Sequence, residues 1–462
     1  MKFDIIVLGS GPGGYVTAIR AAQLGFKTAI VEKENLGGVC LNWGCIPTKA
    51  LLKSAQVFNY IKHASDYGVQ VAEPEVDFRA MVQRSRGVAE SMSKGVEFLM
   101  RKNNITVIKG FGKLLPGKQV EITHEDGLTS VINADHIIIA TGARARQLPN
   151  LPIDGKKVIG YRQAMTLNQQ PKSMIVVGSG AIGVEFAYFY NSIGTQVTIV
   201  EYLDRIVPLE DEEISKQLAR SFKKSKIKVM TSSELLSVDT TGEGVKAIVK
   251  TKKGEVELEA DIVLSAVGIK SNIENIGLKD VGIEVEKDKI KVDKYYQTNI
   301  DGYYAIGDVI NTPALAHVAS AEGITCVEKI AGHDPETIDY NNIPGAVYTD
   351  PEISSTGYTE KQAVEAGHEI LVGKFPFTAS GKAKAAGAPD GFVKIIIDKK
   401  YGEILGAHMI GANVTEMIAE IVAARKAEAT GYSLLKSIHP HPTMSEAVME
   451  AVAAAYDEVI HL

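Results

Sequence analysis

A four-part pattern of apolar and polar positions occurs twice along the chain. An apolar run leads into a glycine-rich turn, a helix-forming stretch and a second apolar run that ends at an acid, Glu32 in the first copy and Glu201 in the second. Short apolar runs bounded by glycine are typical of buried strands. The pattern predicts strands over 3–8, 28–31, 173–177 and 196–200, and helices over 15–24 and 184–192.

The remaining apolar runs extend this picture. Residues 135–141 and 261–268 are predicted as one buried strand in each half, and 302–307 as a short strand that ends before Asp308. From about residue 342 the pattern changes: 392–397 and 404–410 are predicted as a hairpin around a charged turn, and helical stretches rich in Ala and Glu follow. The predicted fold class is α/β, with two Rossmann-like dinucleotide-binding domains followed by an α+β domain.

Composition excludes several classes of protein. The 462 residues are 45% hydrophobic and 23% charged, which is ordinary for a globular protein of about three domains. The net charge of −6 provides no basic surface for nucleic acid or an anionic membrane, and no apolar window is long enough to span a bilayer. The chain starts with a predicted strand and not with a signal peptide, and three cysteines are too few for a disulfide framework. We therefore expect a reducing, cytoplasmic compartment.

Both turns have the spacing of a dinucleotide-binding fingerprint, G-x-G-x-x-G. The first glycine makes the tight turn, the second lets the backbone approach a pyrophosphate, and the third allows close packing of helix on strand. These roles fall to Gly9, Gly11 and Gly14 in the first copy and to Gly178, Gly180 and Gly183 in the second. Each acid follows its first glycine at the same spacing, close to the ~20 residues at which a carboxylate reaches the ribose. The sequence therefore predicts two bound dinucleotides.

The second acid also bears on which nucleotide binds there. Glu201 would repel a 2′-phosphate, and Tyr202 and Leu203 offer no cation to receive one, although Arg205 is near. We therefore predict NAD in preference to NADP.

Two of the three cysteines, Cys40 and Cys45, lie close together in the sequence and precede Lys49. At this separation two thiols can approach across a turn at the start of a helix, where the helix N-terminus and a nearby ammonium favour the thiolate. Zinc would need further ligands that the sequence does not supply at suitable spacing, and two inert thiols are the other alternative. Because the pair follows a dinucleotide-binding unit, we favour a redox-active disulfide. Cys326 stands alone in an apolar stretch and is predicted to lie in the core.

A second candidate site lies near the C-terminus. Prolines on both sides of His441 exclude a helix there and present the imidazole from an ordered loop, and Glu446 could turn back to hold it in one tautomer. An oriented imidazole is the usual general base near neutral pH, although a surface loop without a function fits the spacing equally well.

Together these motifs resemble the class I pyridine nucleotide–disulfide oxidoreductase family over essentially the whole chain. The resemblance rests on GSGPGG with Glu32, CLNWGCIPTK, ATGA at 140–143, GSGAIGVE at 178–185, YAIGD at 304–308, ALAH at 314–317 and HPHPTMSE at 439–446. The resemblance implies that this chain, like some members of the family, oxidises protein-bound dihydrolipoyl groups with NAD⁺. It further implies a redox-active Cys40–Cys45 disulfide and FAD that is bound tightly but not covalently. Ala314, where relatives often have Met, and the segment 269–272, where they carry Arg and Pro, depart from the family pattern.

The resemblance also implies site residues. It assigns the chemistry to Cys40, Cys45, Lys49, Glu185, His441 and Glu446. In this assignment Cys40 is the exposed interchange thiol, Cys45 lies next to the flavin, Lys49 and Glu185 form an ion pair, and His441 comes from the second subunit. It assigns FAD to Gly9, Gly11, Pro12, Gly13, Gly14, Glu32, Lys33, Gly38, Val39, Lys49, Gly112, Thr141, Gly142, Ala143, Asp308, Ala314, Leu315, Ala316 and His317. It assigns NAD to Gly178, Gly180, Ala181, Ile182, Gly183, Glu185, Glu201 and Gly268.

The resemblance further implies an organisation and partners. We expect an FAD-binding domain over 1–149, an NAD-binding domain over 150–271, a central domain over 272–341 that completes the FAD site, and a dimerisation domain over 342–462. The expected partners are a second copy of the chain and the lipoyl domains and acyltransferase core of 2-oxo acid dehydrogenase complexes or the glycine cleavage system, in the cytoplasm or, for a mature eukaryotic protein, the mitochondrial matrix. Another NAD(P)H-dependent disulfide reductase on the same scaffold, or a non-catalytic flavoprotein redox sensor, remains an alternative.

Overall fold

The computed structural model describes residues 1–462 and divides into two compact units. Unit 1 contains residues 1–51, 77–146 and 268–340, and unit 2 contains 52–76, 147–267 and 341–462. The helix α3 (Cys45–Lys62) begins in unit 1 and ends in unit 2. The four-domain division expected from the sequence stays a prediction.

Unit 1 is built on a seven-stranded sheet in the order β3-β2-β1-β6-β5-β4, with β19 paired to the C-terminal end of β6. Its strands are β1 (Lys2–Leu8), β2 (Thr28–Glu32), β3 (Thr106–Lys109), β4 (Phe111–Leu115), β5 (Gln119–Thr123), β6 (Thr129–Ile139) and β19 (Tyr303–Ala305). The strand β1 runs parallel to both β2 and β6 and is almost wholly buried, which explains its continuous apolar run. The first turn therefore lies at the carboxyl end of a central parallel strand, the usual place for a ligand in such sheets.

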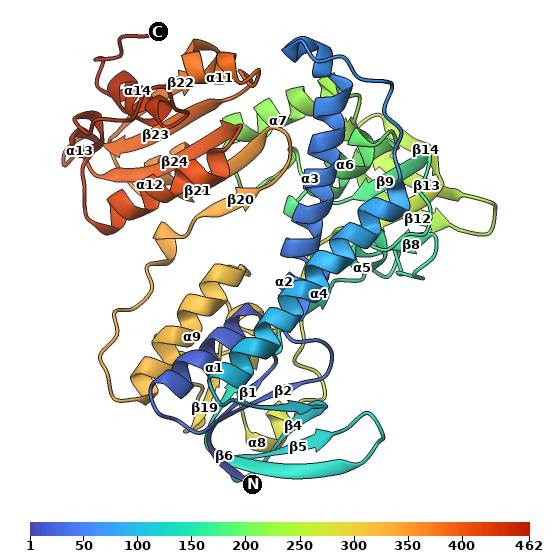
Figure 1. Cartoon of the computed structure of the whole chain (residues 1–462), viewed down its shortest axis with the longest axis vertical. Coiled ribbons are helices and arrows are strands. Elements are labelled where there is room, and N and C mark those ends of the chain that lie inside the picture. The colour runs from blue at the N-terminus through green and yellow to red at the C-terminus, as the bar shows by residue number, and fades with distance from the viewer. The chain divides into compact units, whose positions relative to one another are not determined.

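The helices of unit 1 cover this sheet. They are α1 (Pro12–Gln23), α2 (Gly38–Trp43), α4 (Phe78–Lys102), α8 (Leu278–Val281) and α9 (Ala316–Ile330), and two short strand pairs join them, β7 (Ala143–Ala145) with β16 (Ile269–Ser271) and β17 (Val285–Glu286) with β18 (Lys289–Ile290). Helices α1 and α9 lie side by side although they are far apart in the sequence (Figure 1). Small residues allow this approach, because a side chain at Gly323 would overlap the hydroxyl of Thr17.

The first part of unit 2 repeats the same architecture. A five-stranded parallel sheet has the order β11-β10-β9-β15-β8, and a three-stranded antiparallel sheet β12-β13-β14 is inserted before β15. The elements are β8 (Val158–Ile159), α5 (Tyr161–Ala164), β9 (Ser173–Val177), α6 (Ala181–Ser192), β10 (Gln196–Val200), α7 (Glu212–Lys224), β11 (Lys228–Met230), β12 (Glu234–Asp239), β13 (Val245–Thr251), β14 (Gly254–Ala260) and β15 (Ile262–Ser265).

The C-terminal part of unit 2 is an α+β layer. Its antiparallel sheet β20-β21-β24-β23-β22 and its helices are β20 (Gly345–Val347), β21 (Glu352–Gly357), α10 (Glu360–Glu365), β22 (Ile370–Pro376), α11 (Gly381–Ala385), β23 (Phe392–Asp398), β24 (Ile404–Gly411), α12 (Val414–Lys426), α13 (Gly431–Leu435) and α14 (Glu446–Ala455). Alternate residues of β23 point to opposite faces: Val393, Ile395 and Ile397 join the core beneath α12 and α14, whereas Lys394 and Ile396 face the other side.

The structure confirms the predicted fold class and moves several element ends. Helices α1 and α6 begin three residues earlier than predicted, directly after a glycine N-cap. In α1 the first position is Pro12, which is well suited to the start of a helix, and in both helices the glycine within the first turn did not prevent helix formation. Strands β6 and β15 end before 141 and 268, since Gly142 and Gly268 turn the chain with φ of 66° and 101°. No helix in the chain has the length and the apolar character that crossing a membrane requires.

Candidate functional site

The first glycine turn depends on glycine at two of its three positions. Gly9 has φ of 97°, and a Cβ there would overlap the backbone carbonyl of Ala140. A Cβ on Gly14 would overlap the carbonyl of Gly9, which is the close packing of helix on strand expected for the third glycine. A Cβ on Gly11 would meet nothing within 4 Å. The turn therefore leaves open space beside Gly11, at the positive N-terminus of α1, where a diphosphate fits.

The second turn reproduces this arrangement. Gly178 has φ of 95°, and a Cβ there would overlap the carbonyl of Ala266, while a Cβ on Gly183 would overlap the carbonyl of Gly178. Open space again lies beside Gly180, the N-cap of α6. The two turns therefore offer the same cradle to two dinucleotides.

Each fingerprint acid is held by the turn that it follows. In unit 1, the Ser10 amide and hydroxyl donate to Glu32 Oε2 at 2.9 and 2.6 Å, and the Glu34 amide donates to Oε1 at 2.8 Å. In unit 2, the Ser179 amide and hydroxyl donate to Glu201 Oε2 at 2.8 and 2.6 Å, and the Leu203 amide donates to Oε1 at 2.8 Å. Each buried carboxylate keeps acceptor capacity for a ribose hydroxyl.

The two serines were not among the predicted site residues. The sequence did contain a signal, because the residue after the first glycine is Ser in both copies.

A cavity of about 400 Å³ lies beside the first turn. Its wall brings together five of the predicted FAD residues, Gly9, Glu32, Lys33, Gly112 and Thr141. It also contains Arg144, which forms two hydrogen bonds with the carboxylate of Glu274, at 2.9 and 2.7 Å. These bonds from Arg144, with a further ion pair to Lys270, hold the pKa of Glu274 well below its ordinary value. Arg144 and Glu274 are far apart in the sequence, and the sequence interpretation missed both.

Hydrogen bonds on both sides fix the turn of unit 1 that contains Asp308. The adjacent Gly307 amide donates to the buried Glu322 carboxylate at 2.6 Å, and the hydroxyl of Tyr340 donates to the same carboxylate at 2.9 Å. On the other side, Ser271 Oγ and Lys289 Nζ each donate to the Asp308 carbonyl at 2.7 Å. Burial raises the pKa of the Asp308 carboxyl, and Lys289 opposes this shift.

The predicted segment 314–317 leads from this turn into α9, with Leu315 as the N-cap. Because α9 packs on α1, this segment is positioned by the same helix pair as the first glycine turn. Gly38 lies at the start of α2, where a Cβ would lie 2.6 Å from the Gly11 Cα. The structure therefore places the start of the cysteine segment directly against the first turn.

The cysteines lie on two helices, whereas the sequence predicted a turn at the start of a single helix. Cys40 lies within the short α2, Gly44 ends that helix, and Cys45 opens α3. Cys45 is exposed and Cys40 is half-buried, whereas the resemblance implied that Cys40 is the exposed thiol. A hydrogen bond with Cys45, together with burial, raises the pKa of the Cys40 thiol. The two thiols therefore interact directly, as a pair that closes to a disulfide must. Cys326 is fully buried, as predicted.

The predicted His–Glu contact is present in unit 2. His441 Nδ1 lies 2.8 Å from Glu446 Oε1, and the Thr443 amide donates to Glu446 Oε2 at 2.8 Å. Burial acts to raise the pKa of Glu446, but the Thr443 amide and His441 outweigh it, so that this pKa lies below its ordinary value. The side chain of His441 is 80% exposed. With Nδ1 held by Glu446, Nε2 faces outward as a base can.

Two further predicted residues, Lys49 and Glu185, belong to different units. Lys49 belongs to unit 1, while Glu185, buried on α6 in unit 2, accepts a hydrogen bond from the Tyr348 amide at 3.0 Å. Their ion pair stays a prediction.

Comparison with known proteins identifies the family. Residues 3–323 match the family described as pyridine nucleotide-disulphide oxidoreductase, and residues 343–452 match the dimerisation domain of the same family. The chain belongs to this family. The resemblance and the fold class inferred from the sequence are thereby confirmed, and the family's dimerisation domain supports a homodimer.

Individual relatives within this family cover nearly the whole chain. The chain is 47% identical to a dihydrolipoyl dehydrogenase of Zymomonas mobilis over 461 residues, 99% of each protein, and 44% identical to dihydrolipoyl dehydrogenase of Bacillus subtilis over 472 residues, covering 100% of this chain and 99% of that protein. Among solved structures, LpdA from Mycobacterium tuberculosis matches with a TM-score of 0.91 and 27% identity, covering 97% of this chain and 99% of LpdA. The HOCl-induced flavoprotein disulfide reductase RclA from Escherichia coli, solved as a Cu(II) complex, matches with a TM-score of 0.88 and 25% identity, covering 98% of this chain and 99% of RclA.

Proposed function

We propose that this protein oxidises protein-bound dihydrolipoyl groups with NAD⁺. The observation that carries the proposal is the pair of interacting thiols, Cys40 and Cys45. The helix that contains Cys40 begins at Gly38, which packs directly against the first dinucleotide-binding turn. Relatives that share 42–47% of the sequence over nearly the full chain are named dihydrolipoyl dehydrogenases, which supports the same activity here. The reaction is that of EC 1.8.1.4.

FAD and NAD are the cofactors of this reaction. Glu32 and Gly112, which line the cavity beside the first turn, would hold the adenosine of FAD, and Asp308 would hold its ribityl–phosphate region. NAD belongs to the second turn, with Glu201 on its ribose. The chemistry that FAD supplies when bound is the passage of an electron pair from a dithiol to NAD⁺.

The cysteines exchange electrons with the substrate. One substrate thiolate attacks Sγ of Cys40 in the oxidised pair and releases Cys45 as a thiolate, and the second substrate thiolate then displaces Cys40 from the mixed disulfide. The products are a lipoyl disulfide and a protein dithiol. We assign the electron-donating side to Cys45, because it opens α3, whose N-terminus favours a thiolate.

His441 of the second subunit removes a substrate proton in this scheme. Glu446 holds Nδ1, so Nε2 is the nitrogen that accepts the proton from a thiol. The Lys49–Glu185 ion pair expected beside the flavin completes the proposed site. The finer partners, namely lipoyl domains and the acyltransferase core of 2-oxo acid dehydrogenase complexes or the glycine cleavage system, and a cytoplasmic or mitochondrial-matrix location, rest on the same proposal.

A steady-state comparison of two substrate pairs tests this function. We expect turnover of dihydrolipoamide with NAD⁺ and little turnover of glutathione disulfide with NADPH, and the reverse preference would identify another disulfide reductase. His441→Gln should lower dithiol turnover by about 10²–10⁴-fold while bound FAD is unchanged. Glu446→Gln should cost less, because the imidazole remains. Near-normal turnover of His441→Gln would exclude His441 as the general base.

A further inference from the structure

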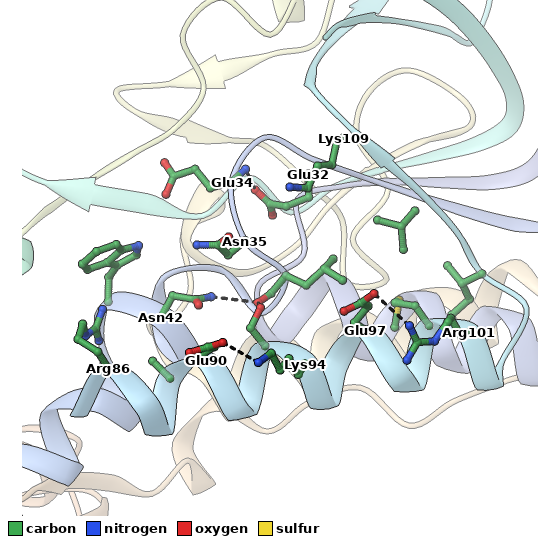
Figure 2. Close-up of a pocket in the computed structure, with 17 residues that line it drawn as sticks. Glu32, Glu34, Asn35, Asn42, Arg86, Glu90, Lys94, Glu97, Arg101 and Lys109 are labelled. Atoms are coloured by element: carbon green, nitrogen blue, oxygen red, sulfur yellow. Dashed lines mark hydrogen bonds and ion pairs between the residues drawn. The ribbon is translucent and has the colours of Figure 1, made fainter. Parts of the chain in front are cut away.

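The chemistry described above leaves Arg86 unused. It lies on α4 beside a cavity of about 650 Å³ (Figure 2). The other cations of α4 at this cavity are paired along the helix, Lys94 with Glu90 at 2.6 Å and Arg101 with Glu97 at 3.1 Å. Nε and Nη2 of Arg86 are instead buried and have no hydrogen-bond partner. A guanidinium in this state is costly unless another contact compensates it.

The compensating contact is aromatic. The Arg86 Cζ lies 4.7 Å from the centre of the Trp43 ring, within the range of a cation–π interaction. Burial lowers the pKa of Arg86, but guanidinium remains charged under any working condition. Arg86 therefore holds Trp43 through the face of its ring.

Trp43 lies between Cys40 and Cys45 in the sequence. It is the last residue of α2 and is followed by Gly44 and Cys45. The backbone is crowded here, because a Cβ on Gly44 would lie 3.1 Å from the Val39 carbonyl oxygen and 3.3 Å from the Cys40 Cα. A movement of Trp43 would therefore shift the tightly packed backbone at Gly44, and with it the position of Cys45 relative to Cys40.

Helix α4 also holds the two ends of this segment. Ser93 Oγ donates to the Leu36 carbonyl at 2.9 Å, where Asn42 Nδ2 also donates at 3.0 Å, and Arg84 Nη1 donates to the Ala50 carbonyl at 2.7 Å. The segment from Leu36 to Ala50 is thus bound to α4 before, within and after the cysteine pair, and Arg86 provides the contact within it.

We propose that Arg86 is a positioning residue that, through Trp43, holds Cys40 and Cys45 at the spacing that favours their disulfide. The inference deepens the proposed function and rests on it. Fixing the segment raises the effective concentration of one thiol at the other, and that concentration sets the equilibrium between the dithiol and the disulfide. Loosening the segment therefore favours the dithiol.

The test is the equilibrium of the holoenzyme with dithiothreitol. In this exchange the protein dithiol gives two electrons and two protons to the cyclic disulfide of dithiothreitol, which opens to its dithiol as the Cys40–Cys45 bond forms. Acid quenching, alkylation and mass spectrometry give the oxidised fraction. We expect Arg86→Met to lower the equilibrium constant for disulfide formation about tenfold, equivalent to a potential about 30 mV less negative. Arg86→Lys should stay within about threefold of the wild type, because its ammonium can still lie over the ring.

Arg101→Met is the matched control. It removes the same charge from the same helix and the same cavity, but its partner is the exposed Glu97, so the equilibrium should not change. An equal shift in Arg101→Met and Arg86→Met would mean that loss of a positive charge alone causes the effect, and it would overturn the proposal. An unchanged equilibrium in Arg86→Met would overturn it as well.

A double-mutant cycle tests the route through Trp43. In a Trp43→Leu background, Arg86→Met should add nothing, whereas an additive effect would contradict the proposal. If Arg86→Met does not retain FAD, the pair Trp43→Phe and Trp43→Leu replaces it, with a shift expected only in Trp43→Leu. A wild-type protein that forms no Cys40–Cys45 disulfide would instead refute the proposed function itself.

Discussion

The two glycine turns of this protein have the same backbone contacts and hydrogen bonds and differ in what surrounds them. Both have a first glycine near φ of 95°, a third glycine packed on the carbonyl of the first, and a serine that donates twice to the acid of the next strand. The same local sequence therefore builds the same turn in both units, independently of the rest of the chain.

The surroundings separate the two turns. In unit 1, α9 packs on α1, a Cβ on Gly13 would lie 3.1 Å from the Ala319 side chain, and the Gly307 turn anchored by Glu322 adjoins the same helix. In unit 2, the residue that corresponds to Gly13 is Ile182, which is exposed, and Tyr202 beyond Glu201 is exposed as well. An enclosed turn suits a cofactor that stays bound, and an open turn suits one that exchanges in every cycle. We therefore predict that α9, which is distant in the sequence, determines how long the cofactor of the first turn stays bound.

The largest expected effect comes from breaking one turn at a time. Gly9→Ala and Gly178→Ala each place a Cβ on a backbone carbonyl at positive φ, which the turn cannot accommodate. Gly9→Ala should yield protein without FAD. Gly178→Ala should retain FAD and lose reduction of NAD⁺ by at least about 10²-fold. Flavin absorbance and NAD⁺ kinetics measure both, and loss of FAD in Gly178→Ala would show that the turns are not independent.

The second prediction concerns how α7, which follows the second turn, is held. Lys394 is 2% exposed and lies within 3.1 Å of Asp211, 3.0 Å of Glu213 and 2.6 Å of Glu360, whereas α1 is held by close packing of small residues. Lys394→Met removes the cation that Asp211, Glu213 and Glu360 share, although Glu213 keeps Lys374 at 2.7 Å. The buried Asp211 is left without its ion-pair partner, so the variant should be destabilised by about 3–5 kcal/mol in denaturant unfolding near pH 7.

The pH dependence of this effect has a defined sign. Burial acts to raise the pKa values of Asp211 and Glu213, but Lys394 and neighbouring donors outweigh it and lower both. Their contribution to stability is therefore present above the ordinary carboxyl pKa and is lost as pH falls through the lowered value. The difference between wild type and Lys394→Met should shrink below about pH 4. A constant difference would mean that the ion cluster is not its source.

A smaller, symmetrical effect is expected from the serines. Ser10→Ala and Ser179→Ala each remove a hydroxyl that donates to a buried carboxylate, a bond worth about 1.5–3 kcal/mol. Ser10→Ala should weaken FAD binding, and Ser179→Ala should raise KM for NAD⁺, each by about 10–100-fold. Unequal losses would show that the acids contribute differently despite their matching geometry.

The smallest effect is expected at Gly13 and Ile182, the corresponding positions at which the two turns differ. Gly13→Ala presses on Ala319 and should speed FAD dissociation several-fold, at a cost of about 1 kcal/mol. Ile182→Ala changes an exposed position and should leave FAD retention unchanged. Dissociation rates of FAD from the two variants, followed by flavin fluorescence, measure the difference, and equal rates would remove α9 as the cause of retention.

This comparison also shows what the sequence could predict. Turn, helix and acid lie within one short segment, so residue types and spacing were enough to find Gly9, Glu32 and their counterparts. His441 and Glu446 were found together for the same reason. The Arg144–Glu274 pair joins residues 130 positions apart, which no local pattern marks. Glu322 and Lys289 are closer in sequence to Gly307 and Asp308, but they belong to no recognised motif spacing. The ends of β6 and the separate helix that carries Cys40 were missed because single glycines end those elements.

The most direct test of the account uses one turnover. Anaerobic holoenzyme mixed with one equivalent of dihydrolipoamide and then with NAD⁺ should produce one NADH for each dithiol oxidised, with the Cys40–Cys45 disulfide restored. Cys40→Ser and Cys45→Ser should each retain FAD and produce no NADH from the dithiol. NADH formed equally by these variants, or none formed by the wild type, would contradict the assignment of the reaction to this cysteine pair.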